Sequence, residues 1–321
     1  MTTCRVCDRP SASSLPVGVY APFFSLRVDT SRDEHALYSA RGAMRALPGR
    51  SFASRARHFA ARKLAGLRAQ RPPTLLRTAC NFCSRCQSLT LSHAYGYDDL
   101  KPLYADYRST GYDRDRISVE PSYAGIAARV GADPVERTSR NRGVADFLAP
   151  LLPQQAMSLA LDLGGSDGKF IPPEVIGRYR ETHIFDTSDA QVDASVRALA
   201  VRKIGDPEPG RYALLMCMHV LEHVGSPRAF VIDSLKYLEP GGLLYLEVPL
   251  ELDPGVEAQF TSRDVDRCIV IHEHINQYSP QSVARLIESI DGLTLLKNEA
   301  ADIDCGWSTG RVGRYLAQRV G

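Results

Sequence analysis

The 321-residue sequence lacks any apolar run long enough to cross a membrane, which takes about 20 consecutive apolar residues. Its first residues, Met1 to Cys7, include no apolar signal region. We therefore expect a cytoplasmic protein, in which thiols stay reduced and free to bind metal. The chain has room for about two domains, and its formal net charge of +2 is close to neutral.

Acidic residues are absent from His35 to Tyr97, whereas nine lysines and arginines lie between Arg41 and Arg71. Ser51 is placed to cap a helix with one apolar face and basic residues on the others. Such a basic face is either simply solvated, or it binds a phosphorylated substrate or an acidic partner. RNA is a less favoured partner, because the basic helix has no interleaved aromatic residues on which bases would stack.

Five of the eight cysteines are grouped at Cys-x-x-Cys spacing. Cys4 and Cys7 form one knuckle, and Cys80, Cys83 and Cys86 form a run at the same spacing. Two knuckles brought together supply four thiolates, the ligand set of a tetrahedral structural Zn²⁺ site. The alternatives are ordinary reduced thiols and a redox pair, although a redox pair would need the strand-to-helix context that lowers a thiol pKa.

The dinucleotide fingerprint Gly-x-Gly-x-x-Gly is absent, and no phosphate-binding Gly-Lys-Ser/Thr is present in its place. Instead, an apolar run containing Asp162 is followed by Gly164, Gly165 and Gly168. This pattern is typical of a buried parallel strand that leads into a loop close to a ligand, because glycine has no Cβ in the way. The sequence therefore favours a nucleoside cofactor without phosphates.

Further strands of an α/β sheet follow this loop. The predicted strands after 158–163 are 183–186, 212–219, 243–248 and the antiparallel pair 293–296 and 315–320. Asp186 ends the second strand, where this fold class places a carboxylate on ribose hydroxyls. In this order the segments resemble an S-adenosylmethionine (SAM)-dependent methyltransferase of the Rossmann-like class. The resemblance implies that Asp162, Gly164, Gly165, Gly168, Asp186 and His219 bind SAM.

The cysteines sharpen this resemblance. The two knuckles, the Gln87-Ser-Leu-Thr-Leu91 segment after the second, and the Gly-x-x-Asp-Gly loop are similar to one group of methyltransferases. That group carries an N-terminal zinc-binding domain and includes the sugar C-methyltransferases of deoxysugar biosynthesis. The second knuckle of the group lies immediately before an apolar strand, which selects Cys4, Cys7, Cys83 and Cys86 as zinc ligands and leaves Cys80 spare. The long connection between the knuckles departs from the group.

The resemblance also implies a domain organisation. Residues 1–95 would form a zinc-binding domain with a basic helical insertion, 96–140 a linker and substrate-lid segment, and 141–321 the SAM-binding domain. The apolar pattern from Arg142 to Ala149 would be the end of the helix that precedes the first strand. In the resembling group the linker folds over the substrate, which makes Tyr107 and Tyr112 candidates to contact it. Ordinary surface tyrosines are the alternative interpretation.

The triplet His272, Glu273 and His274 is the most chemically active group of side chains in the sequence. It either faces the crevice where open α/β sheets bind ligands or forms a polar loop before a helix over 280–289 capped by Ser279. A metal site that adds Cys268 is a third interpretation. The sugar C-methyltransferases carry a similar triplet, which implies His274 as the base and Glu273 as its orienting group, although Ile271 replaces a tyrosine of that group.

The sequence thus predicts SAM-dependent methyl transfer to a carbon or oxygen atom of a small molecule. The acceptor that it favours is a sugar, a nucleotide sugar or a related natural-product intermediate. The alternative is an RNA or protein methyltransferase that docks through its zinc domain and basic helix. A third possibility is a zinc-bearing binding module with a degenerate Rossmann-like domain. The intact Asp162, Gly164, Gly168 and Asp186 argue against that module.

Overall fold

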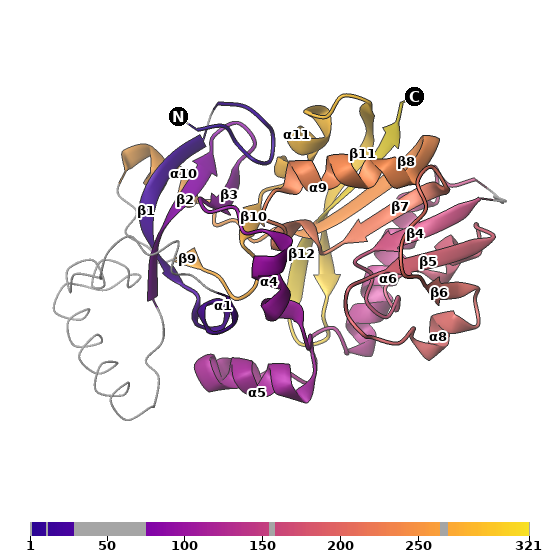
Figure 1. Ribbon diagram of the computed structural model, residues 1–321, viewed down its shortest axis with the longest axis horizontal. Helices are drawn as coiled ribbons and strands as arrows, with labels where there is room; N and C mark the ends of the chain where they lie inside the picture. The colour runs from indigo at the N-terminus through magenta and orange to yellow at the C-terminus, as the bar shows by residue number, and fades with distance from the viewer. Residues whose placement is uncertain (1, 11, 29–74, 154–157, 264–268, 321) are drawn as a thin grey trace. The chain divides into compact units, whose positions relative to one another are not determined.

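The computed structural model describes residues 2–10, 12–28, 75–153, 158–263 and 269–320 (Figure 1). The basic segment 41–71 and Cys268 lie outside these described residues. The chain forms two compact units: the first comprises Met1–Cys4, Arg9–Ala128 and Leu252–Asn276, and the second Arg5–Asp8, Arg129–Glu251 and Gln277–Gly321. Among the described helices, none combines the length and apolar character needed to cross a bilayer.

The second unit is built on a seven-stranded sheet in the order β11-β12-β8-β7-β4-β5-β6. Its strands are β4 (Leu159–Leu163), β5 (Glu181–Phe185), β6 (Val201–Lys203), β7 (Tyr212–Met218), β8 (Leu238–Pro249), β11 (Leu293–Asp304) and β12 (Thr309–Arg319). The five strands from β8 to β6 run parallel, whereas β12 pairs antiparallel with both β8 and β11. This mixed sheet is the class I Rossmann-like arrangement that the sequence predicted.

Helices and short helical turns connect these strands. They are α6 (Pro134–Leu148), α7 (Pro173–Ile176), α8 (Ala194–Arg197), η2 (Leu221–His223), α9 (Pro227–Ser234), η3 (Leu235–Tyr237) and α11 (Ser282–Glu288). Helix α6 ends at Leu148, within the segment that the sequence predicted as the end of a helix, and it begins at Pro134 because Asp133 caps it by accepting a hydrogen bond from the Val135 amide. Helix α11 begins at Ser282 rather than Pro280, and the Ser279 amide donates to the Ser282 hydroxyl at 2.9 Å.

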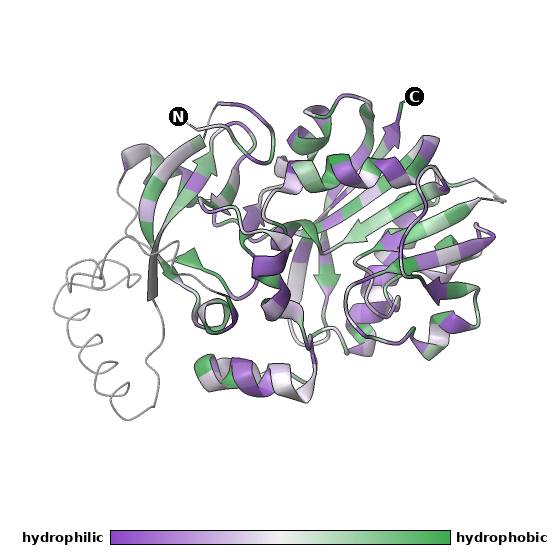
Figure 2. Cartoon of the chain, in the orientation of Figure 1, coloured by the Kyte–Doolittle hydropathy of each residue, from purple (hydrophilic) through white to green (hydrophobic). Residues whose placement is uncertain are grey.

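The core of the second unit lies on the parallel strands. Every residue of β4 is buried, as expected for a central strand covered on both faces. Figure 2 shows hydrophobic residues concentrated along β4 and β7. Helix α6 packs Val144, Phe147 and Leu148 into the same cluster as Ala160 of β4, and full burial of a large apolar side chain contributes about 1.5 to 3 kcal/mol.

The first unit contains most of a smaller sheet with strand order β10-β3-β2-β1-β9, in which β10 begins at the last residue of that unit, Asn276. Its strands are β1 (Ala12–Tyr20), β2 (Leu75–Cys83), β3 (Ser88–Leu91), β9 (Ile269–Val270) and β10 (Asn276–Tyr278). Its helices are α1 (Pro22–Arg27), α4 (Tyr97–Tyr104), α5 (Thr110–Val119), η1 (Pro121–Gly125) and α10 (Val256–Ser262). Strand β2 pairs antiparallel with β1 and β3, and its last residue, Cys83, lies opposite both Ala12 and Ser88.

Candidate functional site

The candidate cofactor site of the second unit lies at the carboxyl ends of its parallel strands. The chain passes from β4 to β5 and β6 on one side and returns to β7 on the other. Such a switch point is where open α/β sheets bind ligands. Asp162 lies near the end of β4, Asp186 follows β5, and His219 follows β7.

The glycines between β4 and α7 are required by the protein's own packing. Gly164 and Gly168 have φ angles of +81° and +76°, which side chains rarely adopt. A Cβ at Gly165 would lie 2.1 Å from Oδ2 of Asp162, and one at Gly164 would lie 2.5 Å from Cγ2 of Val220. The fold of this loop requires these glycines even without a ligand, so they are not evidence for a cofactor. The evidence for cofactor binding comes from Asp162 and Asp186 beside the loop.

Asp162 is a buried acid with an unused oxygen. The residue is 1% exposed, and among the described residues its Oδ1 has no hydrogen-bond partner. Burial, followed by the nearby charge of Asp186, raises the pKa of Asp162 to about 8. A buried polar atom without a partner is costly, and at the edge of a glycine loop it indicates a place for a ligand's donor or positive charge.

Asp186 ties two loops together. Its Oδ2 accepts a hydrogen bond from the Ser166 amide at 3.0 Å, and its Oδ1 accepts one from the Ser188 amide at 2.7 Å. Each carboxylate oxygen can accept a further hydrogen bond. The carboxylate therefore keeps acceptor capacity for the two ribose hydroxyls that the sequence assigned to it, and that contact stays a prediction.

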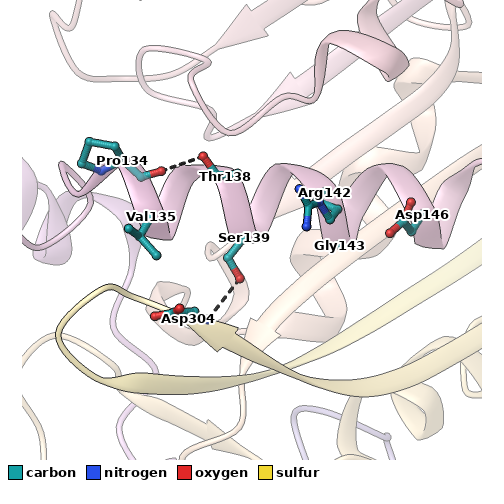
Figure 3. A pocket seen from close by; sticks show the side chains of 8 residues that line it. All are labelled: Pro134, Val135, Thr138, Ser139, Arg142, Gly143, Asp146 and Asp304. Atoms are coloured by element: carbon teal, nitrogen blue, oxygen red, sulfur yellow. Dashed lines mark hydrogen bonds between the residues drawn. The ribbon is translucent and has the colours of Figure 1, made fainter.

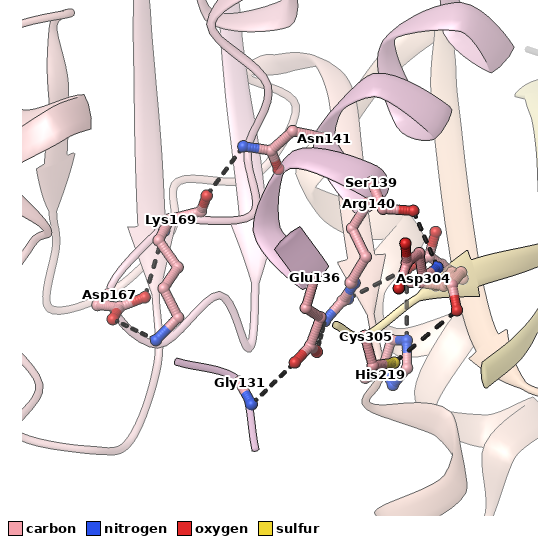
Figure 4. A network of polar contacts seen from close by, with 12 residues as sticks. Gly131, Glu136, Ser139, Arg140, Asn141, Asp167, Lys169, His219, Asp304 and Cys305 are labelled. Carbon is pink, nitrogen blue, oxygen red and sulfur yellow. Dashed lines mark hydrogen bonds and ion pairs between the residues drawn. The ribbon is translucent and has the colours of Figure 1, made fainter. Parts of the chain in front are cut away.

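His219 lies between two fully buried carboxylates. Its Nε2 is 3.3 Å from Oε1 of Glu247, and its Nδ1 is 3.4 Å from Oε1 of Glu222. Arg140 and Arg314 bind Glu247 at 3.1 and 3.0 Å. Burial alone would raise the pKa of Glu247, but the charges of Arg140, His219 and Arg314 outweigh it and hold that pKa well below its usual range. Figure 4 shows Arg140, Glu136 and His219 in this polar network.

The sequence reasoning missed Arg140 and Glu247. A signal for Arg140 was present, since it lies four residues before Val144 and seven before Phe147, on the buried face of α6. Glu247 lies inside an apolar strand, where a buried charge implies a paired partner. No spacing rule identifies that partner, because 107 residues separate Arg140 from Glu247.

A surface pocket of the second unit lies elsewhere, between α6 and the end of β11 (Figure 3). Thr138, Ser139 and Arg142 line it from the helix, and Asp304 lines it from the strand. The Asp304 amide donates to the Ser139 hydroxyl at 3.1 Å. The pocket contains none of the predicted site residues, so we assign it no part in the chemistry.

The predicted catalytic triplet belongs to the first unit, where Glu273 is the best-held member. Glu273 is 6% exposed, and its Oε1 accepts hydrogen bonds from the Tyr112 hydroxyl and the Arg116 guanidinium. Its backbone carbonyl accepts from the Tyr104 hydroxyl at 3.3 Å. The carboxylate is therefore fixed by α5, whereas its predicted contact with His274 stays a prediction.

The two predicted tyrosines have different environments. Tyr112 is 0% exposed, and burial, followed by the charge of Glu273, raises the pKa of its hydroxyl far above the usual range. Tyr107 is half-buried, and its ring packs edge to face on Tyr112 with centroids 5.4 Å apart. In this arrangement the Tyr112 hydroxyl is held by Glu273 and Tyr107 retains a partly accessible ring, and contact of either tyrosine with a substrate stays a prediction.

His272, the first residue of the triplet, lies next to a carboxylate that the sequence reasoning missed, that of Glu120. Nδ1 of His272 lies 2.9 Å from Oε1 of Glu120, and Oε2 of Glu120 accepts from Nε of Arg116 at 3.1 Å. Burial would raise the pKa of Glu120, but His272 and Arg116 together lower it. His274 is half-buried. Cys268 lies outside the described residues, so the metal site that would include it stays a prediction.

The four predicted zinc ligands come together. The thiols of Cys4, Cys7, Cys83 and Cys86 are all buried, and their sulfur atoms lie within 4.8 Å of one another. The Sγ atoms of Cys4 and Cys86 are 3.8 Å apart, close to the edge of about 3.8 Å that a tetrahedron with Zn–S bonds of about 2.3 Å requires. Cys80 is buried on β2, opposite Leu15 and Leu91, and is not part of this group.

Comparison with known proteins identifies the class of the second unit. Residues 137–296, close to half of the chain, match a family profile for a methyltransferase domain. Together with the order of the sheet, this match shows that the chain carries a class I SAM-dependent methyltransferase domain.

Similarity to curated relatives is local. The ubiquinone biosynthesis O-methyltransferase of Burkholderia vietnamiensis is 35% identical over 57 residues, which are 18% of this chain and 25% of that protein. Its counterpart from Idiomarina loihiensis is 33% identical over 58 residues, 18% of this chain and 23% of that protein. The chain therefore spans about a quarter of the length of the curated relatives it matches.

Solved structures share the general arrangement only. The 1,6-didemethyltoxoflavin N1-methyltransferase of Burkholderia thailandensis is 13% identical, with 73% of this chain and 96% of that chain covered and a TM-score of 0.47. A SAM-dependent methyltransferase of Leishmania major is 17% identical, with 60% and 76% covered and a TM-score of 0.44. Likenesses of this size carry no argument about the substrate.

Proposed function

We propose that the protein transfers the methyl group of SAM to a small molecule, a sugar, nucleotide sugar or related natural-product intermediate. The observation that carries the proposal is the unpartnered, buried Oδ1 of Asp162 beside the glycine loop of a methyltransferase domain. The matching curated relatives are named for O-methylation of a small molecule, which is consistent with this class of acceptor.

The cofactor would be held by Asp162, Gly164, Gly165, Gly168, Asp186 and His219. SAM supplies a methyl group already activated by its sulfonium. Asp186 would accept hydrogen bonds from the ribose hydroxyls, and Asp162 would meet a donor or positive charge that compensates its burial. His219 is held in place by Glu247, which is itself fixed by Arg140 and Arg314.

The protein's remaining tasks are to align the acceptor and to remove its proton. In this proposal His274 takes the proton, since an imidazole titrates near neutrality. Glu273 is the orienting carboxylate, with its position set by Tyr112 and Arg116. Residues 96–140, which contain α4 and α5, form the lid segment, and Tyr107 contacts the acceptor.

The N-terminal cysteines hold a structural Zn²⁺ in the same proposal. Four buried thiols within 4.8 Å of one another are the donor set that zinc prefers, and without a metal they would form a tight cluster of weakly bonded polar groups. The Ser88 hydroxyl lies 3.1 Å from Sγ of Cys86 and can donate to that sulfur, the kind of outer contact that orients a metal ligand. Residues 1–95 would then form the zinc-binding domain.

Mass spectrometry with methyl-labelled SAM and a panel of sugar nucleotides and small-molecule alcohols tests the reaction. We expect a labelled product from the wild type, and His274→Ala should keep its SAM affinity but turn over on the order of a hundredfold more slowly, as for a lost general base. His93→Ala, a histidine of the same unit outside the triplet, is the control. Full turnover by His274→Ala would remove His274 from the mechanism.

The same assay separates carbon from oxygen as the methylated atom. A carbon acceptor has an acidic proton beside a ketone, and that proton should exchange with deuterated solvent before methyl transfer. The exchange should vanish in His274→Ala. An oxygen acceptor would show methyl transfer without this exchange.

A further inference from the structure

The loop that carries Asp186 has no regular secondary structure of its own. Residues 187–193 connect the end of β5 to α8 and form neither helix nor strand. The shape of such a segment depends on the groups that bind its backbone from outside. Since Asp186 is the residue proposed to bind the ribose hydroxyls, the groups that hold this loop also set the geometry of the cofactor site.

Lys203, the last residue of β6, binds the middle of this loop. Its half-buried side chain donates from Nζ to the backbone carbonyl of Ser188 and, at 3.2 Å, to the carbonyl of Ala190. Hydrogen bonds from a charged donor are roughly twice as strong as those between neutral groups. One ammonium on the sheet therefore fixes two carbonyls of a segment that lacks hydrogen bonds of helix or strand type.

Ser188 connects this lysine to Asp186. The carbonyl of Ser188 accepts from Lys203, and its amide donates to Oδ1 of Asp186 at 2.7 Å. The other oxygen of the carboxylate, Oδ2, accepts from the Ser166 amide of the glycine loop at 3.0 Å. The Asp186 carboxylate is thus held from two sides, and on one of them it is held through Ser188 by Lys203.

The far end of the loop is attached independently of Lys203. The Asp193 amide donates to the carbonyl of Asp167 in the glycine loop at 2.8 Å. The Asp193 carboxylate caps α8 by accepting from the Ser195 amide at 2.9 Å. Removing the Lys203 bonds would therefore free the middle of the loop and leave both of its ends in place.

We propose that Lys203 is a positioning residue of the SAM site, which holds residues 187–190 so that the Asp186 carboxylate is in place before the cofactor binds. The inference rests on the proposed function for the identity of the ligand. Lys203 acts through Ser188 and Asp186 and not by touching SAM. Its effect is to reduce the loss of conformational entropy that would otherwise accompany cofactor binding.

Hydrogen–deuterium exchange of the full chain tests the restraint without any cofactor. Lys203→Met keeps an unbranched side chain but removes the donor, so residues 187–193 should exchange faster than in the wild type, while β4 and β7 should not change. Arg202→Met is the matched control, because Arg202 also lies on β6 but is 57% exposed and binds Glu181. Wild-type exchange of residues 187–193 in Lys203→Met would overturn the proposal.

Calorimetric titration with SAM tests the consequence for binding. Lys203→Met should bind SAM about tenfold more weakly, the scale of ordering the backbone of one more residue. Saturating SAM should return the exchange of residues 187–193 to the wild-type level, and Lys203→Arg, which keeps a cationic donor, should recover most of the affinity. Unchanged affinity in Lys203→Met, or a loss that Lys203→Arg does not repair, would overturn the role of Lys203. A wild type that binds no SAM would instead overturn the proposed function.

Discussion

Two buried acids of the second unit are held in opposite states by their neighbours. No basic side chain of the described residues is bound to Asp162, and burial raises the pKa of this carboxyl to about 8. Glu247 is just as buried, yet the pKa of its carboxyl is lowered because Arg140 and Arg314 bind it. The carboxyl with an oxygen left unpartnered by the described residues is thus the one beside the glycine loop, which is why we assign it to the ligand.

This difference predicts a pH dependence of stability. A carboxyl whose pKa is raised on folding from about 3.9 binds its proton more tightly in the folded state. The contribution of the protonated Asp162 carboxyl to the free energy of unfolding is therefore complete below about pH 4. It is lost as the pH rises towards about 8, the raised pKa. The asparagine of Asp162→Asn cannot ionise. Without SAM, the free energy of unfolding of this variant should therefore exceed that of the wild type by on the order of a few kcal/mol as the pH rises between these values.

Urea unfolding of the wild type and Asp162→Asn would measure this difference in the free energy of unfolding. The measurements should run from pH 4.5 to about 9, because the pKa of Asp162 is about 3.9 in the unfolded chain and about 8 in the folded one. We expect the two stability curves to meet at the acidic end and to separate with rising pH. Parallel curves would show that Asp162 is ionised in the folded protein.

Single residues also show how far sequence reasoning extended. Asp162 and Asp186 were predicted because each follows an apolar run that had to be a strand. Glu120 was missed although it continues the spacing of four that begins at Tyr112 and passes through Arg116 along α5. That spacing shows a shared face, but the partners of this face, His272 and Glu273, are distant in sequence.

At the scale of elements, the two knuckles have the same backbone form. The residue after the second cysteine of each knuckle has a positive φ: 57° at Asp8 and 52° at Gln87. Side chains enter this region at a cost. Neither position is a glycine, so the knuckles could not be recognised from turn residues and were predicted from the cysteine spacing alone.

The zinc proposal predicts the metal content of the purified protein. It should contain about one Zn²⁺ per chain, the stoichiometry of a closed four-thiolate site. Cys83→Ser should lose the metal, because one ligand of four is replaced by a weaker one. Cys80→Ser is the matched control, a buried cysteine of the same strand that should keep the metal.

Inductively coupled plasma mass spectrometry of both variants gives the answer directly. Zinc retained by Cys83→Ser, or lost from Cys80→Ser, would mean that the ligand set is a different one. Zinc absent from the wild type, prepared without chelators, would contradict the site altogether.

Strands β11 and β12 are longer than predicted, because the predictions relied on apolar residues. Strand β11 extends to Asp304, well beyond the predicted 293–296, because its residues alternate between exposed and half-buried. Strand β12 begins at Thr309 rather than Tyr315. The predictions captured only the most apolar parts. The rest of β11 is specified by pairing with its neighbour, and the missed part of β12 contains the charged Arg314, which is buried because it binds Glu247.

On the scale of the whole molecule, chain order and spatial grouping differ. Leu252–Asn276 follows most of the methyltransferase sheet in sequence, but it belongs to the first unit, with α5 and Glu120. Residue patterns predicted the triplet's chemistry, but they could not show which segment would supply its partners. The domain boundaries at 95 and 140 were drawn along the sequence, and they stay predictions.

The central claim is that the second unit binds SAM through the loops after β4 and β5. Calorimetric titration of the full chain with SAM tests it most directly. The account predicts one site per chain, and Asp186→Ala should weaken binding by about 1.5 to 3 kcal/mol, the range for hydrogen bonds to a charged group. Asp189→Ala, an exposed acid of the same loop, should bind like the wild type.

Because Asp186 also accepts from the Ser166 and Ser188 amides, circular dichroism must first show that the variant is folded. A folded wild type that binds no SAM, or a folded Asp186→Ala that binds with unchanged affinity, would contradict the account.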